Sequence, residues 1–155
     1  LNKGFKVAVV ELSGGRIGIG SLALGIGQAA IDAASRYALE RKQFDRPIAD
    51  FQAIQWKIAD VYTELEAARL LLMNAAFKKE QSVAFGREAS MANLFASEAA
   101  NRACYEAMQI YGGYGYSTEY PVERYVRDVR LTSTDEGTSE IYRLFIVKDI
   151  LSIFM

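Results

Sequence analysis

Hydrophobic residues recur along most of the chain at alternating spacings of three and four, which places them on one face of an α-helix. The first such segment follows Ser13-Gly14-Gly15 and reaches about Arg41. Its predicted buried stripe consists of Ile19, Leu22, Ile26, Ala29, Ala33 and Tyr37. Beside it runs a stripe of small residues, which lets another backbone come close, formed by Ala23, Gly27, Ala30 and Ala34. The pattern predicts one long helix.

Two more long helices are predicted downstream. Pro47 lies in the connector 42–47, and proline is common near a helix start because its missing amide hydrogen is not needed there. An unbroken three-four repeat, typical of long helices that pack at shallow angles, then comprises Phe51, Ile54, Ile58, Val61, Leu65, Ala68, Leu72 and Ala75. After a polar break at 78–86, a third helix reaches about Tyr111. Its seam comprises Ala92, Ala96, Ala99, Ala103, Ala107 and Ile110.

The last part of the chain is predicted to be helical as well. A glycine-rich stretch at 112–115 ends the third helix, and a short helical piece follows to about Arg130. The final helix begins at Gly137 or Thr138, and its predicted buried face consists of Ile141, Leu144, Val147, Leu151 and Phe154. Because no segment alternates convincingly in the manner of a strand, the predicted class is all-α, a bundle of long helices.

The segment before Ser13 has a different pattern. Its apolar run at 5–10 suits either a short strand or the extended tail of a preceding domain, and we favour the tail. The predicted organisation is therefore a tail over 1–12 and one helical domain over 13–155, since 155 residues suffice for one good core. A chain that begins with Leu1 instead of methionine also suggests an excised fragment.

Composition narrows the chemistry. Lysine and arginine number 18 and aspartate and glutamate 19, so no global field draws in a polyanion and nucleic acid is not an expected partner. Histidine is absent, so proton transfer near neutral pH falls to a carboxylate, lysine, tyrosine or a cofactor. Cys104 is the only cysteine, which excludes an internal disulfide and a multi-thiolate metal site. We expect it to be a small buried hydrophobe, and we expect no metal.

Neither membrane insertion nor export is expected from the sequence. The longest apolar stretches are broken by charge before the roughly 20 residues that a membrane span needs. The first residues also lack the basic, apolar and small-residue order of a signal peptide.

Three stretches together resemble the acyl-CoA dehydrogenase family. The first is GRIGI at 15–19, opening a helix that ends in ERKQF at 40–44, followed by PI at 47–48 and FQ at 51–52. The second is QIYGGYGY at 109–116, continued by EYPVERY at 119–125 and RD at 127–128. The third is EGTSEI at 136–141. They occur in the family's order and cover essentially the whole chain, so the match is highly specific.

The resemblance implies a fold, an activity and partners. The fold is a four-helix up-and-down bundle, preceded in full-length members by an amino-terminal helical domain and a middle β-domain. The activity is FAD-dependent α,β-dehydrogenation of an acyl-CoA thioester, in which a base removes the α-proton while the β-hydrogen leaves as hydride to FAD. Electron-transfer flavoprotein is the implied acceptor, a homodimer or homotetramer the implied assembly, and the bacterial cytoplasm or mitochondrial matrix the implied location. We expect this piece by itself to bind FAD poorly and to catalyse nothing.

Glu136 matches the family's catalytic glutamate. The α-proton is weakly acidic, so a base must lie close to it in a partly dehydrated site where charge growing on the carbonyl oxygen is stabilised. The residue type by itself leaves an alternative open. A glutamate just ahead of a helix also stabilises that helix, by about 0.3 to 1 kcal/mol, through interaction with the helix dipole. Some relatives carry the base where this chain has Gly15, which has no group to ionise. Glu136 is therefore the favoured base.

The resemblance also assigns residues to ligands, and their types suit the task. A guanidinium pairs with pyrophosphate, bare glycine admits a ligand close to the backbone, and amides at a helix start favour phosphate. FAD contacts are implied for Arg41, Gln43, Phe44, Gln52, Gln109, Ile110, Tyr111, Gly112, Gly113, Thr138, Ser139 and Glu140. Substrate contacts are implied for Ser13, Gly14, Gly15, Arg16, Asp135 and Gly137. In the family many of these FAD contacts reach the flavin of a neighbouring subunit.

Three positions depart from the family pattern. Asp135 stands where an aromatic residue usually precedes the glutamate, Ser13 replaces an aspartate near the CoA end, and Asp45 replaces a glycine. The acyl chain is interpreted as short or branched. Two alternatives stay open: a non-catalytic helical oligomerisation domain, and a flavin oxidase or monooxygenase of the same superfamily in which Asp135 is the base.

Overall fold

The computed structural model describes residues 4–155, with the side chains of 5–10 left aside. Five α-helices occupy most of these residues: α1 Gly4–Glu40, α2 Gln52–Glu80, α3 Gly86–Tyr111, α4 Val122–Leu131 and α5 Ser139–Leu151. A short hairpin of β1 Lys42–Gln43 and β2 Arg46–Pro47 joins α1 to α2 through the 3-10 helix η1 Ile48–Asp50. A second 3-10 helix, η2 Gly112–Tyr116, follows α3.

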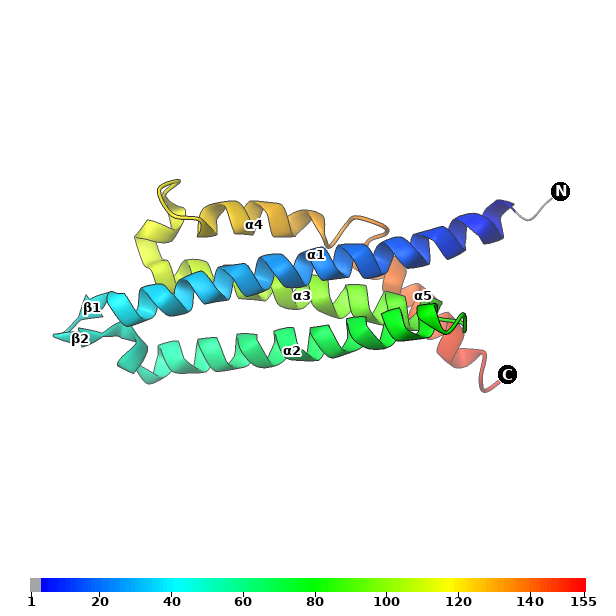
Figure 1. Cartoon of the computed structure of the whole chain (residues 1–155), viewed down its shortest axis with the longest axis horizontal. Coiled ribbons are helices and arrows are strands. Elements are labelled where there is room, and N and C mark those ends of the chain that lie inside the picture. The colour runs from blue at the N-terminus through cyan, green and yellow to red at the C-terminus, as the bar shows by residue number, and fades with distance from the viewer. Residues whose placement is uncertain (1–3) are drawn as a thin grey trace.

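The helices form an up-and-down bundle, as the family resemblance implies. The long helices α1, α2 and α3 run side by side, and α4 lies along α1 and α3 (Figure 1). Because α3 packs against all four other helices, it is the centre of the bundle. The hairpin β1–β2 marks one end of the bundle, and α5 crosses the opposite end (Figure 1). These two ends carry the residues of functional interest.

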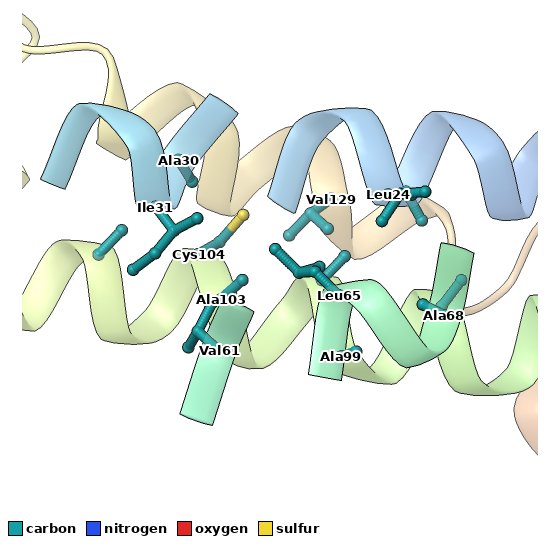
Figure 2. Packing of buried hydrophobic residues seen from close by; sticks show 14 of the residues in the cluster. Leu24, Ala30, Ile31, Val61, Leu65, Ala68, Ala99, Ala103, Cys104 and Val129 are labelled. Carbon is teal, nitrogen blue, oxygen red and sulfur yellow. The ribbon is translucent and has the colours of Figure 1, made fainter. Parts of the chain in front are cut away.

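Small residues form much of the core. The alanine seam of α3 is buried, and so are Val61, Leu65 and Leu72 of α2, as their spacing predicts. Figure 2 shows Ala99 and Ala103 of α3 close to Val61 and Leu65 of α2. A Cβ at Gly27 would lie 3.0 Å from the Ala100 Cα, so glycine allows a close approach where α1 crosses α3. Cys104 is a free buried thiol in this core, as expected, and burial raises its pKa to about 12.

The buried face of α1 is centred on the small residues instead of the predicted larger ones. Ala23, Ala30 and Ala34 are completely covered, whereas Leu22 is 48% exposed. Five residues of the predicted stripe are only partly buried, namely Ile19, Ile26, Ala29, Ala33 and Tyr37. The physical reason is that the line of closest approach between two helices follows the residues that allow it. The larger side chains then lie at the margins of the contact.

The predicted extended tail is wrong for residues 4–12, because α1 begins at Gly4 and continues without a break. Residues 1–3 lie outside the described part of the chain. The glycines after Ser13 suggested an interruption, yet they are helical. Gly15 lacks a side chain for another reason: a distant loop lies directly against it.

The predicted buried face of α5 is also wrong. Its members are exposed, with Leu144 at 63% and Phe154 at 81%, while α5 buries Ser139 and Tyr142. Apolar periodicity shows which residues share a face, but it does not show that the same chain covers that face. Within residues 4–155, no element covers it.

One helix in the described part of the chain, Glu11–Glu40, has the length and hydropathy of a membrane span, although its charge-free run is shorter than a span. A core helix of similar composition meets the same criteria. Ala23, Ala30 and Ile31 of this segment are fully buried against the bundle, which accounts for its apolar character.

Candidate active site

Glu136 lies in the loop between α4 and α5, and this loop reaches α1 at Gly15. A Cβ placed on Gly15 would be 2.5 Å from the Glu136 Cδ and Oε1. The side chain is partly buried, and its Oε2 has no hydrogen-bond partner in the described part of the protein. A carboxylate oxygen left unpaired away from water is costly, and such groups concentrate at functional sites. Glu136 and Gly15, the two positions that the resemblance implies for the base, are therefore adjacent in space.

The guanidinium of Arg16 is a buried positive charge beside this carboxyl. It is 3% exposed, and its Nη1 donates a hydrogen bond to the Ser90 Oγ at 3.0 Å. The guanidinium also lies over two aromatic rings of α5, 5.3 Å from the centroid of Tyr142 and 4.6 Å from that of Phe145. Burial lowers the pKa of Arg16, while the hydroxyl of Tyr142 and the carboxyl of Glu136 oppose that shift.

Asp135 has a different role from its neighbour. Its Oδ1 accepts a hydrogen bond from the Glu136 amide at 3.0 Å, so the carboxylate faces its own loop backbone. The Glu136 carboxyl instead faces α1. Of the two acids, Glu136 is the one whose oxygens are not committed to the loop.

Sequence reasoning missed two polar residues beneath the loop, Tyr142 and Asn93. The Tyr142 hydroxyl donates to the Asp135 carbonyl at 2.8 Å and accepts from the Asn93 Nδ2 at 3.1 Å. Both side chains are fully buried. Burial, with Glu136 and Asp135 nearby, raises the pKa of Tyr142 to about 12. The available signal was a polar residue at a buried helical position: Asn93 follows Ala92 in the alanine seam, and Tyr142 faces it from α5.

The start of α5 adjoins the loop. Thr138 is the N-cap residue, and its hydroxyl accepts from the Ile141 amide at 3.4 Å. Ser139 is buried and Glu140 is exposed. A backbone hydrogen bond and the Thr138 hydroxyl lower the pKa of Glu140. These three predicted cofactor contacts therefore lie at the same end of the bundle as Glu136.

A cavity of about 330 Å³ opens beside Arg16 at this end. It brings together two predicted substrate residues, Ser13 and Arg16, with residues of α3 and α5. Its remaining lining consists of Gly86, Arg87, Phe145, Lys148, Asp149 and Ser152. Gly14 lies outside this lining, and a Cβ there would be 3.1 Å from the Lys79 Nζ.

The hairpin end holds a second cavity, of about 490 Å³. Segments that are distant in the sequence meet there, and six of the predicted FAD contacts line it: Arg41, Gln43, Ile110, Tyr111, Gly112 and Gly113. Tyr37, Ile48 and Tyr114 complete the lining. Phe44, Gln52 and Gln109 are exposed but outside it, and Phe44 is 87% exposed. The three predicted contacts in the α5 segment, Thr138, Ser139 and Glu140, are not part of this group.

The groups around the second cavity suit a phosphate-bearing aromatic ligand. The Arg41 guanidinium lies 5.5 Å from the Tyr114 ring centroid, and the rings of Tyr37 and Tyr111 stack at 4.1 Å. A Cβ at Gly112 or Gly113 would meet nothing within 4 Å, so the backbone there is open to approach. Arg41 directly follows the last residue of α1, and Arg16 lies 25 residues earlier in the sequence, which corresponds to roughly 37 Å at about 1.5 Å per residue.

Comparison with known proteins identifies the family. The family model "Acyl-CoA dehydrogenase, C-terminal domain" matches residues 2–151. A probable acyl-CoA dehydrogenase of Bacillus subtilis is 54% identical over 96% of this chain and 39% of its own length. The mitochondrial short-chain specific acyl-CoA dehydrogenase of Bos taurus is 52% identical over 96% of this chain and 36% of its own length.

A solved structure shows the same arrangement of helices. The butyryl-CoA dehydrogenase of Megasphaera elsdenii superimposes with a TM-score of 0.95 at 46% identity, over 96% of this chain and 39% of that one. The chain thus spans about two fifths of the length of the relatives it matches. It belongs to the acyl-CoA dehydrogenase family of flavoprotein oxidoreductases and corresponds to the family's carboxyl-terminal helical domain.

Proposed function

We propose that this chain is the part of an FAD-dependent acyl-CoA dehydrogenase that supplies the catalytic base, contacts to the flavin and the oligomer interface. The observation that carries the proposal is the carboxyl of Glu136. It lies against bare Gly15, with one oxygen buried and unpartnered. Such a group can accept a proton without first breaking a hydrogen bond to the protein.

The chain's own residues account for the proton transfer. Glu136 accepts the α-proton of the thioester, and the absence of a side chain at Gly15 leaves its carboxyl in place. The buried guanidinium of Arg16 lies close enough to the Glu136 carboxyl for the two groups to interact through charge. FAD, when bound, takes up the hydride from the β-carbon. The substrate lies along Gly14 and Gly137, with Ser13 toward its CoA end.

FAD fits the residues of the hairpin end. Arg41 offers a guanidinium for the pyrophosphate, and Gly112 and Gly113 offer open backbone. Thr138, Ser139 and Glu140 lie at the other end of the bundle, beside the start of α5 (Figure 1). One chain therefore presents two separate sets of flavin contacts, which supports the proposal that neighbouring subunits share them in a homodimer or homotetramer. Phe44, Gln52 and Gln109 belong to the set at the hairpin end, since they are exposed there.

The substrate and partners follow from the relatives. Two of them are named for butyryl-CoA and for short acyl chains, which supports a short-chain acyl-CoA thioester as the substrate. Electron-transfer flavoprotein is the proposed acceptor. The relatives compared are bacterial and mitochondrial, which supports the bacterial cytoplasm or the mitochondrial matrix as the location.

The test removes the base and leaves the fold. In the full-length protein that contains this domain, Glu136→Gln is expected to keep the yellow colour of bound flavin and to lower acyl-CoA-dependent dye reduction by about 10²–10⁴-fold, the usual contribution of a general base. Glu66→Gln, on the exposed face of α2, is the matched control and is expected to be fully active.

Two other results would change the assignment. If Asp135→Asn abolishes proton abstraction while Glu136→Gln does not, the base is Asp135 and the oxidase or monooxygenase alternative holds. If the full-length protein binds no flavin, the chain is a helical oligomerisation domain only.

A further inference from the structure

The backbone at Glu136 is strained. Its φ is +59°, in the left-handed region, where a side chain other than glycine costs about 1 kcal/mol or more. The next residue, Gly137, has a φ of +124°. Glycine adopts such a φ without strain, but the conformation of Glu136 persists only if its surroundings hold it in place.

Tyr142 of α5 contacts this loop in two places. The Tyr142 hydroxyl donates to the Asp135 carbonyl at 2.8 Å. The Tyr142 ring lies under the other side of the loop, because a Cβ on Gly137 would be 3.2 Å from the ring's Cε1. The residues immediately before and after Glu136 are therefore both fixed by Tyr142.

Tyr142 is itself fixed by the bundle. It has no exposed surface, and its hydroxyl accepts a hydrogen bond from Asn93 of α3 at 3.1 Å. The Arg16 guanidinium of α1 lies 5.3 Å from the ring centroid. Through Tyr142, the loop is connected to α1 and α3, the two helices that pack together most extensively.

We propose that Tyr142 is a positioning residue, whose hydroxyl and ring hold the Asp135–Gly137 turn so that the Glu136 carboxyl stays against Gly15. This inference rests on the proposed function, in which Glu136 is the base. Because burial raises the pKa of Tyr142 to about 12, its hydroxyl remains protonated and donates to the Asp135 carbonyl at any working pH of the enzyme.

The variant Tyr142→Phe in the full-length protein tests the hydroxyl and keeps the ring. We expect kcat to fall about tenfold, since the buried hydrogen bond from the hydroxyl to the Asp135 carbonyl is lost, with KM changed less than about twofold. The kinetic isotope effect on the α-deuterated substrate should rise, because proton removal becomes slower. Tyr62→Phe is the control: it removes an exposed hydroxyl bond from α2 to Asp32 of α1, and it should leave kcat and the isotope effect unchanged.

A second measurement does not depend on turnover. The Glu136 amide donates to the Asp135 Oδ1, so its hydrogen exchange reports whether the turn is held. Exchange at Glu136 should be faster in Tyr142→Phe and unchanged in Tyr62→Phe. Asn93→Ala removes the side chain that donates to the Tyr142 hydroxyl. In this variant, exchange at Glu136 should be about threefold faster and kcat about threefold lower. It also serves if Tyr142→Phe fails to fold.

The outcomes separate the two proposals. Unchanged kcat, isotope effect and amide exchange in Tyr142→Phe, together with an inactive Glu136→Gln, would overturn the positioning role and keep Glu136 as the base. A fully active Glu136→Gln would overturn the proposed function, and the exchange measurement would still decide whether Tyr142 holds the turn.

Discussion

The two ends of the bundle hold their polar groups in opposite ways. At the α5 end, Arg16, Asn93 and Tyr142 are buried and linked to one another or to the loop. At the hairpin end, Gln43, Gly112 and Gly113 are exposed, and the aromatic rings of Tyr37 and Tyr111 form the floor of an open cavity.

This difference corresponds to two kinds of task. A group that reacts must keep its place to within a fraction of an ångström, which requires neighbours whose own positions are fixed. A surface that grips an extended ligand instead needs accessible donors and open backbone, because the ligand itself completes the packing. We therefore expect substitutions at the α5 end to change the reaction rate, and those at the hairpin end to change ligand affinity.

The largest effect is expected at Gly15. In Gly15→Ala the new Cβ would lie within 2.5 Å of the Glu136 carboxyl, which must move away. Since a displacement of about 1 Å can cost about 10²-fold in rate, kcat should fall by about 100-fold. Thermal unfolding should show no loss of stability, because the displaced atoms are the end of a flexible side chain and alanine favours the helix. Steady-state kinetics and calorimetry measure the two quantities.

The same helix supplies the control. Gly18 is exposed, and a Cβ there meets nothing within 4 Å. Gly18→Ala should therefore stabilise α1 by about 0.5–1 kcal/mol and leave kcat unchanged. Equal activity in Gly15→Ala and Gly18→Ala would show that the reaction does not depend on the position of the Glu136 carboxyl against Gly15.

A smaller effect, and of a different kind, is expected at Arg41. Arg41→Lys keeps the charge but loses the planar pair of donors, so the dissociation constant for FAD should rise about tenfold in the full-length protein. Once flavin is saturating, kcat should recover. Arg36→Lys, on the exposed surface of α1, should change neither quantity. Fluorescence titration of the apoprotein measures the affinity, and a lasting loss of kcat at saturation would contradict the division between the two ends.

The smallest effect concerns the stability of the α5 end. Burial opposes ionisation of Glu88, but hydrogen bonds from Lys78 and Arg87 outweigh it and lower the pKa of this carboxyl. The contribution of the Glu88 carboxylate to the free energy of unfolding is therefore fully present above its unfolded-state pKa of about 4.3. It is lost as the pH falls through the lower pKa of the folded state. Glu88→Gln should cost about 1 kcal/mol at pH 7 and less at pH 3, as measured by denaturant unfolding. An equal cost at both pH values would contradict the ion pairs.

Much of the fold follows from the sequence. The periodicity predicted α2, α3, α4 and α5, and it also predicted the buried seams of α2 and α3. These seams are predictable because the apolar face of a long helix is covered by the long helix beside it. The periodicity did not predict which face of α1 is buried. Ala23 and Ala30 are buried there instead of Leu22, because small residues allow α1 to approach its neighbours closely. Nor did the periodicity show that Leu144 and Leu151 of α5 stay exposed, since covering them depends on surfaces outside residues 4–155.

The site was predictable only in part. The resemblance proposed Glu136 and Gly15 as alternative base positions, but their contact depends on a loop that folds back across more than 100 residues of sequence. No local pattern encodes such a long-range approach. Tyr142 and Asn93 were missed for a related reason: each reads as one polar residue in its own helix, and their shared hydrogen bond exists only after α3 and α5 have packed.

The left-handed backbone at Glu136 also bears on how this domain can change in evolution. Glycine tolerates that conformation best, so Glu136→Gly relieves about 1 kcal/mol of strain in the same step that removes the carboxylate. Selection for a folded chain therefore does not protect the base that we propose. A duplicated gene that is no longer selected for turnover can lose its chemistry here through one nucleotide change in a glutamate codon, and its product would still assemble.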